Sequence, residues 1–191
     1  KLILEDGTFN SEITADLTSY FADRFAFRQE MITGYAAIQA ALFQESSAED
    51  VILGEDGWLF YKEGDKQKQS VMLPHDAMLH EKRDPKAESG SAGAFFPGGV
   101  FCYERKIMLT EDQVQMHLTL EFEGAYKNAE VFVNGQEVYQ AAYGYSPFFV
   151  ILDGHIKAGE NTILVKTDNS QQPDSRWYSG AGIYRPVWLH I

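Results

Sequence analysis

Side chains able to take part in acid and base catalysis, or to bind a metal ion, lie close together at His75, Asp76 and His80. An imidazole beside a carboxylate can exchange protons, and two histidines can ligate zinc. Adjacent residues of an extended chain point to opposite faces, so His75 and Asp76 are not expected to act on one group. His75 and His80 are five positions apart, which fits neither the i, i+4 pair of a helical zinc site nor the i, i+2 pair of a strand. We therefore expect a loop-packing role for His75 and Asp76, no metal and no cofactor.

The elements that must position these residues follow a period of two over most of the chain. Between residues 114 and 122, apolar and polar residues alternate, as in a strand with one face on a core. Asn134-Gly135 predicts a hairpin turn, because both residues accept positive φ values. Strands are expected near residues 100–109, 114–122, 131–133, 137–140, 148–152, 162–166 and 183–190. The pattern predicts a mainly β fold over residues 62–191: an antiparallel β-sandwich of the jelly-roll, galactose-binding-like kind.

Residues 1–61 follow a different pattern. Between residues 10 and 43, apolar residues recur in steps of three, four or seven, which places them on one face of a helix. Two strand-like runs follow, at 51–53 and 58–61, around a turn rich in Gly and Asp. We expect a helical N-terminal segment over residues 1–61, before the sandwich of residues 62–191. A second irregular stretch, 81–99, is longer than an ordinary connection, which often marks a functional loop.

The charge and composition exclude several classes of protein. The 191 residues include 16 basic and 28 acidic side chains, a formal net charge of −12. Binding to DNA or RNA needs clustered Lys and Arg, so nucleic acid is not an expected partner. No apolar run approaches the ~20 residues that a membrane span needs. Cys102 is the one cysteine, so no disulfide can form within the chain.

The β part resembles the N-terminal sugar-binding domain of glycoside hydrolase family 2, the family of β-galactosidases, β-mannosidases and β-glucuronidases. The motifs that carry the resemblance are found at 73–76 (LPHD), 99–105 (GVFCYER), 123–125 (EGA), 129–135 (AEVFVNG), 159–162 (GENT) and 175–187 (SRWYSGAGIYRPV). Most of these residues are expected to be architectural. The resemblance covers about residues 65–191, and the order and spacing of the motifs make it specific.

The resemblance implies a sugar-binding role without catalysis. In this family two glutamates on a following (β/α)8 barrel perform the chemistry, about 5 Å apart in retaining enzymes. The family's acid/base glutamate follows an Asn, and no Asn-Glu dipeptide occurs in this chain, so no catalytic residue is assigned. The sandwich would border the sugar pocket of such a barrel and bind a β-glycoside weakly. The residues expected to contact the sugar are Asp174, Arg176, Trp177 and Tyr178. A carboxylate and a guanidinium can form paired hydrogen bonds with hydroxyls, and an aromatic face can cover the apolar side of a pyranose.

Residues 10–61 resemble the start of extracytoplasmic polysaccharide O-acetyltransferase-like proteins of the SGNH hydrolase type, related to alginate acetylation and DHHW proteins. The motifs are at 20–28 (YFADRFAFR) and 51–61 (VILGEDGWLFY). The nucleophilic serine of such enzymes lies in a Gly-Asp-Ser block, which this chain lacks, so no catalytic triad is assigned. Trp58 and Phe60 could belong to either part, and the chain is a natural fusion, an engineered chimera or a mis-joined sequence. Localisation stays unassigned, with an extracytoplasmic or cell-surface place favoured over the cytoplasm.

Three functional hypotheses follow. The first is a non-catalytic carbohydrate-binding module of a family 2 glycosidase. The second is a fragment of an SGNH-type polysaccharide-modifying enzyme, carried by residues 10–61. The third is a protein-interaction module, in which the apolar face of the N-terminal helix packs on the sandwich or forms a homodimer.

Overall fold

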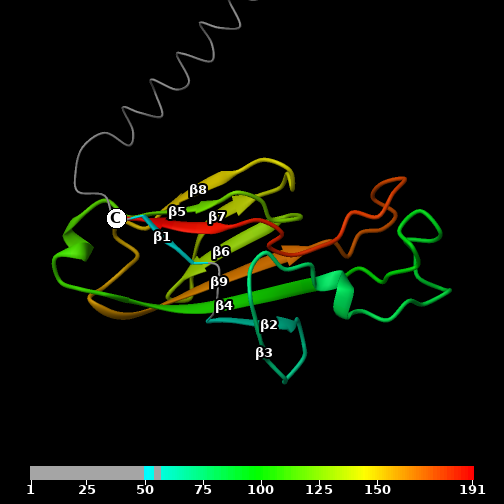
Figure 1. The fold of residues 1–191 in the computed structure, drawn as a ribbon, viewed down its shortest axis with the longest axis horizontal. Helices are drawn as coiled ribbons and strands as arrows, with labels where there is room; N and C mark the ends of the chain where they lie inside the picture. Colours follow the sequence, from blue (N-terminus) through cyan, green and yellow to red (C-terminus); the bar gives the residue numbers. More distant parts are fainter. Residues whose placement is uncertain (1–49, 54–56) are drawn as a thin grey trace, which may run out of the picture. The chain divides into compact units, whose positions relative to one another are not determined.

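The computed structural model describes residues 50–53 and 57–191, which form a mainly β structure of two antiparallel sheets (Figure 1). The smaller sheet has the order β1-β10-β5-β8. Its strands are β1 (Asp50–Ile52), β10 (Val187–His190), β5 (Thr119–Phe122) and β8 (Phe148–Ile151). Every neighbouring pair in this sheet is antiparallel.

The larger sheet has six strands in the order β3-β2-β4-β9-β6-β7. They are β3 (Gln69–Val71), β2 (Trp58–Lys62), β4 (Val100–Leu109), β9 (Gly159–Asp168), β6 (Ala129–Val133) and β7 (Gln136–Ala141). The long central strands β4 and β9 pair over their whole length. Buried residues alternate with more exposed ones along β9, as expected of a strand with one face on a core, whereas β4 also buries three consecutive residues, Phe101–Tyr103.

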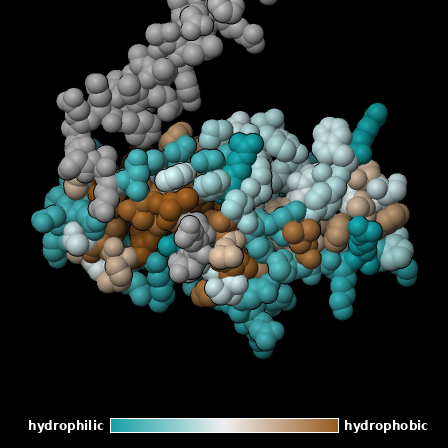
Figure 2. All heavy atoms as spheres, in the orientation of Figure 1, coloured by the Kyte–Doolittle hydropathy of each residue, from teal (hydrophilic) through white to brown (hydrophobic). Residues whose placement is uncertain are grey.

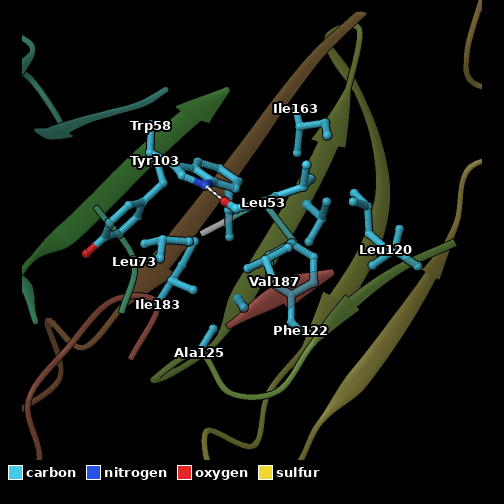
Figure 3. Packing of buried hydrophobic residues seen from close by; sticks show 14 of the residues in the cluster. Leu53, Trp58, Leu73, Tyr103, Leu120, Phe122, Ala125, Ile163, Ile183 and Val187 are labelled. Atoms are coloured by element: carbon cyan, nitrogen blue, oxygen red, sulfur yellow. Dashed lines mark hydrogen bonds between the residues drawn. The ribbon is translucent and has the colours of Figure 1, made fainter. Parts of the chain in front are cut away.

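One hydrophobic core draws residues from both sheets, as in a β-sandwich (Figure 3). From the larger sheet, Trp58 and Tyr103 are fully buried, and from the smaller sheet Leu120 and Phe122 are fully buried. The indole N–H of Trp58 donates a hydrogen bond of 2.5 Å to the carbonyl of Leu53. This bond satisfies the one polar atom that a buried tryptophan brings into a core.

The sheets include residues that the sequence analysis assigned to the N-terminal segment. Strand β1 pairs with β10, and β2 lies between β3 and β4. Trp58 and Phe60, left open between the two parts, point into the sandwich core. The sandwich therefore takes in strands before residue 62, because their apolar side chains complete its core. The helix predicted over 10–43, and the homodimer predicted through it, lie outside the described residues.

Local structure agrees with the sequence patterns in several places and departs from them in others. The strand predicted over 183–190 is shorter, since β10 begins at Val187. The hairpin predicted at Asn134-Gly135 is confirmed, with φ values of 51° and 83°. The strand predicted over 114–122 is shorter, because Gln113–Gln115 forms a 3₁₀ helix and β5 begins at Thr119. Thr110 and Gln113 exchange side-chain to backbone hydrogen bonds of 2.9 and 3.2 Å, which stabilise this turn in place of a strand.

Large exposed apolar side chains are spread over several parts of the described surface, among them Met72, Leu79, Met108 and Trp177. Figure 2 shows apolar residues gathered over the place where β1 and its neighbours lie in Figure 1. Ile52 and Ile151 of the smaller sheet are among the exposed apolar residues. Within the described part of the chain, no helix has the length and apolar character needed to cross a membrane.

Candidate functional site

A pocket of about 550 Å³ lies where three connections between strands meet. Its walls come from residues 126–127 between β5 and β6, residues 142–145 between β7 and β8, and residues 174–177 between β9 and β10. The second and third connections, yellow and orange in Figure 1, extend toward the same end of the sandwich. Loops held by a rigid sheet pair are where binding residues are commonly found.

Backbone and side-chain contacts hold the three connections together. Tyr126 and Gly182 exchange two backbone hydrogen bonds of 2.9 and 2.8 Å, which ties the first connection to the third. The hydroxyl of Tyr184 donates to the carbonyl of Gly144 at 2.8 Å, which ties the third to the second. A Cβ at Gly144 would lie 2.4 Å from the ring of Tyr126, so only glycine allows this close approach.

The carboxylate of Asp174 is engaged by two neighbours on the first connection. Lys127 Nζ lies 2.6 Å from Asp174 Oδ1, and the hydroxyl of Tyr126 donates to Asp174 Oδ2. The hydrogen bonds from Lys127 and Tyr126 lower the pKa of Asp174, so the carboxylate stays ionised. Burial, together with the hydrogen bond to Asp174, raises the pKa of Tyr126. The Asp174–Lys127 pair is thus a neutral, hydrogen-bonded unit in the wall of the pocket.

Aromatic rings form much of the remaining wall. The rings of Tyr126 and Tyr145 lie 5.2 Å apart between centroids, and those of Tyr143 and Tyr145 lie 5.7 Å apart in an edge-on arrangement. Trp177 and Tyr143 are the most exposed of the aromatic residues here, at 63% and 66%. Large aromatic side chains are normally buried, so their exposure around a pocket is typical of a binding surface.

Three of the four residues expected to contact a sugar line this pocket: Asp174, Arg176 and Trp177. Tyr178 lies apart from it. Its hydroxyl donates to Asp76 Oδ2 at 2.6 Å, and its ring packs on Phe96 with centroids 5.6 Å apart. Burial, with the hydrogen bond to Asp76, raises the pKa of Tyr178.

The motif at His75 and Asp76 packs loops together, as predicted. Asp76 Oδ1 accepts from the backbone N–H groups of Met78 and Ala181, both at 3.0 Å. His75 Nδ1 lies 2.8 Å from the hydroxyl of Tyr103. These contacts tie the start of the 3₁₀ helix η1 (Ala77–His80) to β4 and to the β9–β10 connection.

The structure brings His75 and His80 together although their spacing favours neither a helical nor a strand pair. Their Nε2 atoms are 2.9 Å apart and their rings stack with centroids 4.9 Å apart, because η1 turns the chain between them. Burial and the charge of His80 lower the pKa of His75 to about 4. Among the described residues, no group of three or more His, Cys, Asp or Glu side chains is arranged to hold a metal ion.

Sequence reasoning missed the residues of the pocket that come from the other two connections, namely Tyr126, Lys127, Tyr143 and Tyr145. One signal was available for the second connection. Tyr143-Gly144-Tyr145 is a short aromatic and glycine-rich run between two strands, where aromatic side chains have no core to enter. Nothing local marks Tyr126 and Lys127, whose role depends on Asp174, 48 and 47 positions further along the chain.

An antiparallel two-sheet domain with an aromatic pocket, polar groups and a guanidinium at its loops defines a carbohydrate-binding β module. The comparison with family models agrees with this class. The family model described as "Glycosyl hydrolases family 2, sugar binding domain" matches residues 94–191. The chain belongs to glycosyl hydrolase family 2, through the sugar-binding domain of that family.

Curated relatives and solved structures agree with the family. The β-galactosidase BoGH2A of Bacteroides ovatus is 41% identical over 118 residues, covering 61% of this chain and 14% of that protein. A β-glucuronidase of Formosa agariphila is 32% identical over 164 residues, covering 70% of this chain and 16% of that protein. A crystal structure of a β-glycosidase from Bacteroides vulgatus superposes with a TM-score of 0.67 at 28% identity, over 74% of this chain and 20% of that one. The chain thus spans about a sixth of the length of these two curated relatives, or less.

Proposed function

We propose that this sugar-binding domain receives a pyranose of a β-glycoside in the pocket formed by residues 126–127, 142–145 and 174–177, without hydrolysing it. The observation that carries the proposal is the meeting of exposed aromatic rings with charged side chains in one pocket of about 550 Å³. A pyranose has an apolar face and a rim of hydroxyls, so it needs this combination of surfaces.

Within the pocket, each group has a distinct role in this proposal. Trp177, 63% exposed, offers the aromatic face on which the sugar ring lies. The guanidinium of Arg176 donates to the sugar's oxygens. The Asp174 carboxylate has lone pairs beyond those used by Lys127 and Tyr126, so it can still accept from a hydroxyl.

We expect no hydrolysis because the pocket lining has too few carboxyl groups for it. Hydrolysis of a glycoside by the usual route needs two carboxyl groups on opposite sides of the scissile bond. Among the described residues that line the pocket, Asp174 is the one carboxylate, and its lowered pKa makes it a poor proton donor. We expect weak, millimolar-range affinity, since an open pocket covers only part of a sugar.

In a longer protein we propose that the domain borders the sugar pocket of a catalytic barrel, and that its two sheets follow the jelly-roll, galactose-binding-like arrangement. The family membership and the small share of the relatives that the chain spans support this setting. A homodimer through residues 10–43 is a separate proposal, which rests on the apolar periodicity of that segment alone.

The test is a titration of the ¹⁵N-labelled chain with methyl β-D-galactopyranoside, followed by amide and indole N–H shifts. We expect saturable shifts at the Trp177 indole and at residues 142–145, and loss of binding in Trp177→Ala. Phe95→Ala is the matched control, because Phe95 is an exposed aromatic (39%) on another loop that does not line the pocket. Shifts that scatter over the surface, or binding that survives Trp177→Ala, would contradict the proposed site. Turnover of an aryl β-galactoside that persists in Asp174→Ala would contradict the absence of catalysis.

A further inference from the structure

Two histidines outside the sugar pocket bring their ring nitrogens together at the surface. The Nε2 atoms of His75 and His80 lie 2.9 Å apart, in a contact that is exposed to solvent. Neither residue lines the pocket formed by residues 126–127, 142–145 and 174–177. The proposed sugar site therefore does not use this pair.

The surroundings hold the two imidazole rings in place. The buried ring of Phe60 packs against both, with its centroid 4.7 Å from that of His75 and 5.8 Å from that of His80. His75 Nδ1 lies 2.8 Å from the hydroxyl of Tyr103, a residue fully buried in the core. A hydrogen bond at the far ring nitrogen is also what orients most histidines that bind a metal ion. The pair is thus positioned by the fold itself.

Both rings can offer a lone pair at Nε2. Burial and the charge of His80 lower the pKa of His75 to about 4, so the ring of His75 is neutral near pH 7. When both rings are neutral, one Nε2–H donates to the other Nε2. If the donor ring carries its proton on Nδ1 instead, both Nε2 atoms can bind an ion, and His75 Nδ1–H then donates to the oxygen of Tyr103. The net charge stays the same, because the proton only changes its place on the ring.

The spacing of the two nitrogens favours one coordination geometry. With metal–nitrogen bonds of about 2.0–2.1 Å, two ligands at a right angle lie about 2.9 Å apart, whereas two ligands of a tetrahedral zinc ion lie about 3.3 Å apart. The observed 2.9 Å matches adjacent corners of a square, which is the geometry typical of Cu²⁺ with nitrogen and oxygen ligands. Cu²⁺ also binds a given site more tightly than the other divalent ions of the first transition row.

We propose that His75 and His80 form a surface site that binds one Cu²⁺ ion through their Nε2 atoms, with water at its other positions. Water is needed because, among the described residues, no third His, Cys, Asp or Glu side chain is placed to join the pair. The carboxylate of Asp76 is near enough to act on the charge of His75, and it favours a bound cation. A spacing of five residues fits neither a helical nor a strand pair, but the turn at η1 brings the two rings together.

The experiment adds copper(II) sulfate in substoichiometric amounts to the ¹⁵N-labelled full chain and follows the paramagnetic broadening of its amide signals. We expect the amides of residues 75–81 to broaden first, because the broadening falls steeply with distance from the ion. Electron paramagnetic resonance of the same sample should show two coordinated nitrogens. Zn²⁺ should displace Cu²⁺ only at about tenfold or greater excess.

Two single variants identify the ligands. His80→Ala removes one ligand at an exposed position, so the domain should still fold. It should lower the affinity for Cu²⁺ at least about tenfold, since losing even a group that only orients a ligand costs that much. His117→Ala is the matched control, because the side chain of His117 is 98% exposed, lies just before β5 and pairs with Asp153. It should leave the affinity and the set of broadened amides unchanged.

The outcomes separate this pair from other places that Cu²⁺ could occupy. Selective broadening at residues 75–81 that disappears in His80→Ala, together with two coordinated nitrogens, supports the site. Broadening centred elsewhere, for example at His190, which contacts Asp50 and Glu121, overturns it. An affinity that survives His80→Ala also overturns it, and so does Zn²⁺ that competes on equal terms, because the nitrogen spacing would then select nothing. None of these results depends on whether the pocket binds a sugar.

Discussion

Replacement of Asp76 by alanine tests whether the His75-Asp76 motif holds the loops of the domain together. One oxygen of this carboxylate, Oδ1, accepts two backbone N–H groups, from Met78 and Ala181, each at 3.0 Å. The other oxygen, Oδ2, accepts from the exposed hydroxyl of Tyr178. Met78 and Ala181 are only 3% and 2% exposed. Alanine therefore leaves two buried donors without a partner and removes the N-cap of η1.

The expected loss follows from these contacts. A buried donor left unsatisfied costs about 1–3 kcal/mol, and an N-cap replaced by alanine costs about 1 kcal/mol. The backbone N–H of Met78 is counted in both figures, so the two costs do not simply add. The hydroxyl of Tyr178 adds little, because it is exposed and can donate to water instead. We therefore expect Asp76→Ala to lower the free energy of unfolding by about 3 kcal/mol. Asp76→Asn keeps an Oδ1 that can accept both backbone N–H groups, and should cost about 1 kcal/mol or less.

Urea unfolding followed by tryptophan fluorescence measures the difference, with Trp58 buried in the core as the reporter. Asp84→Ala is the control, because Asp84 accepts a single exposed backbone N–H, that of Lys86, at 2.8 Å. It should change stability by no more than about 0.5 kcal/mol. If Asp76→Asn destabilised the protein as much as Asp76→Ala, the charge and not the two accepted N–H groups would matter, and the reasoning would be refuted. A loss under about 1 kcal/mol for Asp76→Ala would refute it as well.

Three further predictions concern the same loops. Gly182 has φ 100°, and a Cβ there would lie 2.0 Å from the Tyr103 hydroxyl, so Gly182→Ala should cost about 3 kcal/mol in the same urea assay; an unchanged midpoint would contradict it. Burial and the neighbouring imidazole of His80 lower the pKa of His75 to about 4, whereas in the unfolded chain this pKa is about 6.5. The full contribution of His75 to the free energy of unfolding is therefore present above about pH 6.5. It is lost as the pH falls from about 6.5 toward 4, because the unfolded chain takes up the proton first. Because the group is only half-buried, we expect a loss of about 1 kcal/mol, visible as a steeper pH dependence of the urea midpoint than in His75→Gln; identical slopes would exclude it. Asp174→Ala removes the carboxylate proposed to accept a hydrogen bond from a sugar hydroxyl and leaves Lys127 without its partner, so the pocket should bind methyl β-D-galactopyranoside more weakly by NMR titration; unchanged binding would show that the carboxylate does not contact the sugar.

Much of the fold could be predicted from the sequence because its signals are local. Alternation of apolar and polar residues reflects the geometry of a single strand, and β4 spans the residues expected of it. The Asn134-Gly135 turn depends on the φ values of two residues, and it forms as predicted. The same reasoning failed at 113–115, where side-chain hydrogen bonds between Thr110 and Gln113 compete with the strand pattern.

The site could be predicted only in the part that one segment supplies. Asp174, Arg176 and Trp177 come from a single motif and lie in one pocket. Tyr178, the next residue, lies outside that pocket because its hydroxyl donates a hydrogen bond to Asp76, 102 positions away. A hydrogen bond over that separation depends on how the loops meet, which no local pattern of residues records.

By itself, the sequence determined the mainly β character of the domain, its turns and the family to which it belongs, since all three rest on residue types at fixed spacings. The tertiary structure alone decided that residues 126–127 and 142–145 complete the pocket, that Trp58 and Phe60 belong to the sandwich, and that Asp174 is neutralised while Arg176 is not. The physical reason is that strand order and register bring together connections dozens of residues apart, and a side chain's charge and partners are settled only by what those connections place beside it.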